Sequence, residues 1–126
     1  MFGTLLTVAA GGAIGASLRY LTGVMVVRLL GQTGFPVAII LVNVLGSFLM
    51  GVFVVLAAQR GLTYLSPLVM TGVLGGFTTF SAFSLEAVSL YERGDAGQAV
   101  LYVCLSVALS ILGLVAGLAV ARGVLT

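Results

Sequence analysis

The chain has 126 residues, of which 61% are hydrophobic and 6% are charged, with a formal net charge of +2. A soluble domain carries roughly 25% charged residues, so this composition predicts a protein whose solvent is lipid. Five scattered Arg residues are too few for a nucleic-acid surface. The single cysteine, Cys104, excludes an intrachain disulfide and is expected to be a small buried hydrophobe. At about 20 residues per helical span, we expect one domain, residues 1–126.

Four hydrophobic runs predict four membrane-spanning helices in an all-α protein. The first run lacks a basic leader and a cleavage site, so we expect a retained span and not a signal peptide. Short polar links separate the runs, and one of them reads YERGDAG. The expected spans are Thr4–Leu30, Pro36–Ala58, Leu62–Tyr91 and Gln98–Ala121.

Glycines recur at four-residue spacing in three of these spans. Small residues at this spacing let helix backbones approach closely in lipid. We therefore expect tight helix packing at Gly11/Gly15, Gly72/Gly76 and Gly113/Gly117.

The arginines give no signal for orientation in the membrane. In a four-span bundle Arg60 and Arg122 lie on one side, and Arg28 and Arg93 lie on the other. The positive-inside rule requires an excess on one side. Either the insertion machinery overrides a weak signal, or the chain inserts in both orientations. Dual insertion predicts antiparallel pairs, which would build from two chains the inverted symmetry that larger transporters carry in one.

Two polar side chains lie at membrane depth in the first two spans. Asn43 must find partners in hydrocarbon, either as an interhelical hydrogen bond or as a donor that faces a pathway. Gly46 and Ser47 lie on the same helix face and extend a small polar strip. Arg19 either snorkels to the interface or raises the local anion concentration at a pore mouth.

Hydroxyls recur along the fourth span. Tyr102, Ser106 and Ser110 follow one another at four-residue spacing and form one stripe. Serines in membrane helices often bond back to their own backbone, so a polar track and three local hydrogen bonds both remain open. In the third span, Glu86 lies beyond the glycine-rich centre and is the candidate for a proton carrier.

The centre of the third span reads GVLGGFTTFSAFS. Gly75 and Gly76 are poor helix formers, and Thr78 and Thr79 are β-branched and stiff. This composition predicts a helix break near the middle of the span. A break frees carbonyl oxygens, which suit a hard cation where bulk water is absent. The alternative is an intact helix with a glycine packing notch.

Phe80 and Phe83 share a helix face, with Ser81 and Ser84 beside them. The rings either face lipid or present electropositive edges to a small anion that has lost its water. Such groups bind weakly enough to release the ion, as conduction requires. The sequence contains no nucleophile–base pair, His/Cys cluster or phosphate-binding loop, so it predicts a protein that is not an enzyme.

Three segments carry a resemblance to a known family: GGAIGASLRY (11–20), NVLGSFLMG (43–51) and GGFTTFSAFSLE (75–86). Along essentially its whole length the chain resembles the Fluc (CrcB-type) fluoride channels. The resemblance implies an antiparallel, dual-topology homodimer with four spans per subunit. It also implies two separate pathways, through which fluoride leaves passively across the plasma (inner) membrane of a bacterium.

The resemblance also implies roles for individual residues. A pore asparagine matches Asn43, and paired pore phenylalanines match Phe80 and Phe83. The family's hydroxyl track matches Ser106 and Ser110, with Tyr102 less securely placed, and its first-span arginine matches Arg19. A structural Na⁺ is expected on the carbonyls of Gly75 and Thr78 of both subunits. Some relatives carry a hydroxyl where this chain has Ile39, which affects the complete set of polar ligands.

Two other functions compete with a channel. A small proton-coupled multidrug exporter would use Glu86, but the first span has no acidic residue and the chain has no Trp. A bundle that only supports a partner protein would not explain why Asn43, a divided third span and a serine stripe occur together.

Overall fold

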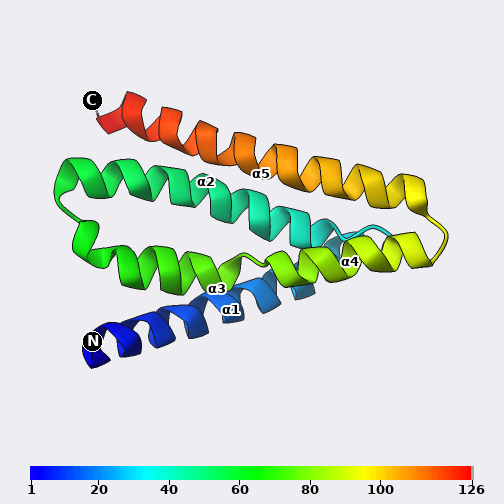
Figure 1. Ribbon diagram of the computed structural model, residues 1–126, viewed down its shortest axis with the longest axis horizontal. Coiled ribbons are helices and arrows are strands. Elements are labelled where there is room, and N and C mark those ends of the chain that lie inside the picture. Colours follow the sequence, from blue (N-terminus) through cyan, green and yellow to red (C-terminus); the bar gives the residue numbers. More distant parts are fainter. Residues whose placement is uncertain (126) are drawn as a thin grey trace.

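The protein is all-helical in the computed structural model, which describes residues 1–125. Within that range four long segments are apolar enough to cross a membrane, which confirms the predicted number of spans. Successive spans run in opposite directions, and both termini lie at the same end of the molecule (Figure 1). The spans are α1 (Phe2–Leu30), α2 (Val37–Arg60), the composite segment Thr63–Glu92, and α5 (Ala96–Leu125).

The third span combines four helical pieces. They are η1 (Thr63–Leu65), the π-helical η2 (Pro67–Leu74), the single turn α3 (Gly75–Phe77) and α4 (Phe80–Glu92). Thr78 and Thr79 separate α3 from α4 and have extended backbone, with ψ angles of 160° and 121°. The residues that leave helical geometry are therefore the two stiff threonines, whereas the glycine pair stays helical.

The helices pack at the glycines that the sequence analysis singled out. α1 packs against η2 and α3, while α5 lies along α2 and also contacts α4. A methyl group added to Gly11 would lie 2.9 Å from the Cα of Gly72, and one added to Gly76 would lie 2.7 Å from the oxygen of Gly12. On the other side of the bundle, Gly117 meets the Phe48 carbonyl. Close packing at the spaced glycines is confirmed.

Little of the chain is buried. One cluster of buried residues joins α4 to α5, and it consists of Phe83, Leu90, Ala99 and Tyr102. Most other large apolar side chains are exposed, as expected for helices whose outer surfaces contact lipid. Cys104 is among the exposed residues, so the expectation that it is buried was wrong. An apolar solvent imposes no penalty on an exposed apolar side chain, so burial does not follow from hydrophobicity here.

We predict that Gly15→Ala destabilises the fold. The added methyl would contact the Val73 carbonyl and the amide nitrogen of Phe77, so α1 and the third span would have to separate. Overpacking of this kind costs about 1–3 kcal/mol, which thermal unfolding in detergent measures. Gly23→Ala is the matched control, because a methyl there meets nothing within 4 Å. Equal stability of the two variants would contradict the packing described here.

Candidate functional site

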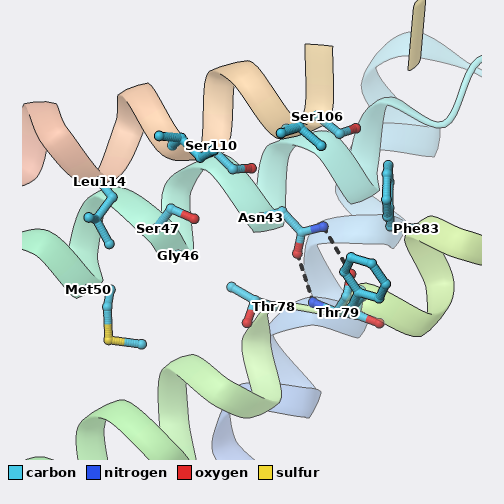
Figure 2. A pocket seen from close by; sticks show the side chains of 13 residues that line it. Asn43, Gly46, Ser47, Met50, Thr78, Thr79, Phe83, Ser106, Ser110 and Leu114 are labelled. Carbon is cyan, nitrogen blue, oxygen red and sulfur yellow. Dashed lines mark hydrogen bonds between the residues drawn. The ribbon is translucent and has the colours of Figure 1, made fainter. Parts of the chain in front are cut away.

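A groove of about 400 Å³ lies between α2, the interrupted third span and α5. It brings together five of the predicted pathway residues, namely Asn43, Phe80, Phe83, Ser106 and Ser110. Figure 2 shows the side chains of Ser47, Ser106 and Ser110 along one side and those of Thr78 and Thr79 on the other. The other lining residues are Gly46, Met50, Val107, Ile111 and Leu114.

Asn43 and Thr79 are joined by two hydrogen bonds. The Asn43 amide Nδ2 donates to the Thr79 carbonyl at 3.0 Å, and the Thr79 N–H donates to Asn43 Oδ1 at 2.8 Å (Figure 2). Asn43 therefore holds two spans together and lines the groove as well. The interhelical hydrogen bond that its sequence position suggested is present, and its role as a donor to a pathway stays a prediction.

The interruption diverts two amides from their helical acceptors. In a continuous helix the Thr79 N–H would donate to the Gly75 carbonyl, but here it donates to Asn43. Likewise the Ala82 N–H donates to Thr79 Oγ1 at 3.1 Å, and not to the carbonyl of Thr78. The carbonyls of Gly75 and Thr78 are therefore left without their helical donors. Such oxygens fit the ligand preference of a hard cation.

Arg19 reaches the same interruption from α1. Its side chain is partly buried, and Nε donates to the Gly76 carbonyl at 3.1 Å. A cation at the carbonyl end of a helix is favourable, so Arg19 stabilises the end of α3. Its expected influence on anions at a pore mouth stays a prediction.

Aromatic rings continue from the groove into the core. The centroids of Phe80 and Phe83 are 5.4 Å apart, and those of Phe83 and Tyr102 are 5.3 Å apart. Phe35, which the sequence analysis did not select, meets Tyr102 edge to face at 5.6 Å. Phe80 is 77% exposed and Phe83 is buried, so the pair connects the outer surface to the interior.

The predicted hydroxyls fall into different environments. Ser106 lines the groove, and its buried Oγ has no hydrogen-bond partner among the described residues; the same is true of the buried Tyr102 hydroxyl. Ser84 Oγ donates to the Phe80 carbonyl at 3.0 Å, and Ser81 Oγ lies 3.4 Å from Thr79 Oγ1. Ser81, Ser84 and Tyr102 are not part of the groove lining.

Glu86 lies in a different place. It lines a second cavity of about 280 Å³ together with Arg93 and the link between α1 and α2. Arg93 Nη2 donates to the Gly34 carbonyl in that link at 2.9 Å. Glu86 is thus separate from the groove that Asn43, Phe80 and the other three predicted lining residues share.

Thr79 lines the groove, although its sequence position did not suggest a place on the anion path. Its side chain caps the first turn of α4 and its backbone pairs with Asn43. The signal was present, because threonine is a favoured residue immediately before a helix. β-Branching alone predicted only a stiff residue in a break.

A family model described as CrcB-like protein, Camphor Resistance (CrcB), matches residues 6–118. The chain belongs to the CrcB family. A relative from Ruegeria sp. (strain TM1040) is 71% identical over 123 residues, which is 98% of each chain. A relative from Roseobacter denitrificans is 73% identical over 122 residues, 96% of this chain and 97% of the relative. One from Cereibacter sphaeroides (strain ATCC 17029) is 63% identical over 98% of each chain.

All three CrcB relatives are named fluoride-specific ion channel FluC. The resemblance found in the sequence is therefore confirmed. This CrcB protein is a member of a channel family and is not an enzyme, as the sequence predicted.

We predict that Ser106→Ala leaves the free energy of unfolding unchanged or slightly increased. The hydroxyl is buried without a protein partner, so its removal breaks no hydrogen bond and relieves part of the desolvation cost of an unpaired buried group, which is about 1–3 kcal/mol. Thermal unfolding of the purified protein in detergent measures the effect. A loss above about 1 kcal/mol would mean that the hydroxyl is bonded within the protein.

Proposed function

We propose that this multi-pass membrane protein is a passive, fluoride-selective channel that lets fluoride leave across the plasma (inner) membrane of a bacterium. The observation that carries this proposal is its match, over 96–98% of the chain, to relatives that are 71% and 73% identical and are named fluoride-specific ion channels. The groove supports the proposal because it gathers the amide, hydroxyl and aromatic groups that suit a small anion.

Weak donors replace the water of the ion along the proposed pathway. The second N–H of the Asn43 amide, the hydroxyls of Ser106 and Ser110, and the ring edges of Phe80 and Phe83 are the donors. None of the described residues that line the groove is charged, so the anion is held loosely enough to move on. Ser81, Ser84 and Tyr102 flank this route, and Arg19 raises the anion concentration near it.

The working unit in this proposal is an antiparallel homodimer with two pathways. A polar groove exposed to lipid cannot conduct, because the polar groups along it need protein or water around them. A second copy would cover the groove and the exposed ring of Phe80. The balanced arginines favour neither orientation, which supports antiparallel pairing. Two-fold symmetry then produces every pathway twice.

A structural Na⁺ at the dimer axis completes the proposal. The carbonyls of Gly75 and Thr78 from both subunits would hold it, and the diverted amides at the interruption leave these oxygens available. When bound, the ion would supply a positive charge that ties the two interruptions together. It takes no part in the passage of fluoride.

We predict an electrogenic fluoride leak from liposomes that contain the purified protein. A fluoride electrode should record efflux without a proton gradient, while chloride is retained. Asn43→Asp and Phe80→Ile should each slow the efflux at least about tenfold, which corresponds to about 1.4 kcal/mol on the barrier. Thr22→Val, which removes a local bond to Leu18 on α1, serves as the control and should conduct normally.

The same assay distinguishes the competing exporter. If Glu86→Gln abolished all transport while polar replacements of Phe80 and Phe83 were tolerated, a proton-coupled exporter would replace the channel. The absence of any fluoride leak from the wild-type protein would refute the proposal itself.

We also predict insertion in both orientations. Gln59→Cys, in a Cys104→Ala background, places the only thiol near the end of α2, where residue 59 is exposed. In intact cells a membrane-impermeant maleimide should modify about half of the protein, and permeabilisation should expose the rest. Complete labelling, or none before permeabilisation, would contradict dual topology.

A further inference from the structure

We propose that Asn43 is a positioning residue for the cation. Its side-chain oxygen accepts a hydrogen bond from the Thr79 N–H, and this keeps the Gly75 carbonyl available as a ligand. This inference rests on the proposed function. It means that a residue lining the anion groove determines the geometry of the cation site.

The Thr79 N–H has a different acceptor from the one that a continuous helix would give it. An α-helix that continued through the interruption would pair the Thr79 N–H with the Gly75 carbonyl. Instead that N–H lies 2.8 Å from Asn43 Oδ1, and the backbone of Thr78 and Thr79 is extended. The amide stays satisfied, which is required where water is absent, and the Gly75 oxygen keeps its lone pairs for another partner.

The contact with Asn43 also fixes the orientation of the Thr79 backbone. Asn43 also donates from Nδ2 to the Thr79 carbonyl at 3.0 Å, so one side chain exchanges both bonds with one residue. A neighbouring strand pairs with a residue in the same way. Two bonds prevent the rotation that one bond would permit. Figure 2 shows both bonds crossing from α2 to the interruption.

α2 also shapes the space beside this pair. One turn after Asn43, a methyl group on Gly46 would contact the side-chain methyl of Thr78. The absence of a side chain at residue 46 therefore makes room for Thr78. One face of α2 thus accommodates both extended residues.

The second carbonyl is kept available by a different group. Thr79 Oγ1 accepts the Ala82 N–H at 3.1 Å, and this N–H would otherwise bond to the Thr78 carbonyl. Gly76, by contrast, has its carbonyl occupied by Arg19. Asn43 and the Thr79 hydroxyl therefore act in parallel, each on one of the two oxygens that the cation would use.

Asn43 should therefore affect cation binding, which a role in anion binding alone would not produce. Without an acceptor at residue 43, the Thr79 N–H would turn toward the Gly75 carbonyl and compete with the cation for it. Loss of the acceptor should therefore weaken cation binding whether or not fluoride is present. If Asn43 served only as a donor to the anion, cation binding would not change.

The test is a Na⁺ titration of thermal stability on the full-length protein in detergent, at constant ionic strength and without fluoride. A cation that binds the folded state raises the unfolding temperature by mass action. Asn43→Leu, which has similar size and no acceptor, should raise the apparent Na⁺ dissociation constant at least about tenfold. Asn43→Asp keeps the acceptor for the Thr79 N–H but loses the Nδ2 donor, so it should weaken Na⁺ binding clearly less than Asn43→Leu does, although its fluoride efflux falls.

Thr79 provides a second, matched comparison. Thr79→Val removes the hydroxyl acceptor and should weaken Na⁺ binding, whereas Thr79→Ser should retain it. Thr22→Val is the control for loss of a hydroxyl elsewhere. Should Asn43→Leu yield no folded protein, Asn43→Ser replaces it, because its shorter side chain cannot make both contacts with Thr79.

The outcomes separate the inference from the proposal on which it rests. Equal Na⁺ affinity in wild type and Asn43→Leu, or equal weakening in Asn43→Leu and Asn43→Asp, would overturn the inference. A wild-type protein whose stability does not depend on Na⁺ would overturn the cation site itself. The fluoride efflux of the wild type is measured independently of both.

Discussion

A helix interrupted within a membrane must find protein partners for the backbone groups that it releases, because no bulk water is present to bind them. At Thr78 and Thr79 three side chains meet this requirement. Asn43 comes from α2, Arg19 from α1, and the Thr79 hydroxyl from the interruption itself. The close glycine contacts between α1 and the third span matter for the same reason, since they bring Arg19 within reach of the Gly76 carbonyl.

The same two extended residues lie between groups that attract cations and groups that attract anions. Carbonyl oxygens without donors attract cations, while amide hydrogens, hydroxyls and ring edges attract anions. In our proposal Asn43 belongs to both, because its oxygen keeps a carbonyl available and its second N–H is a donor to fluoride. A mutation at this residue therefore affects two ions, and only variants that separate acceptor from donor can assign its effects.

Much of the fold could be predicted from the sequence, because the spans and the spaced glycines depend on local periodicity. A break in the third span was predicted from its glycine and threonine content, and Thr78 and Thr79 are extended in that segment. The pairing of Asn43 with Thr79 could not be predicted, since it joins residues 36 positions apart and depends on the register between two helices. Nor could the π-helical η2 or the contact of Phe35 with Tyr102. Their spacing predicted that Ser81 and Ser84 lie beside Phe80 and Phe83 on the anion path, and both lie outside the groove lining.

In the proposed channel, uncharged donors conduct fluoride and reject other anions. The most direct measurement is the reversal potential of the purified protein in a planar bilayer with opposing gradients of fluoride and chloride. We expect a current that reverses at the fluoride equilibrium potential and does not respond to changes in chloride or pH. A reversal potential that follows chloride or protons would contradict it.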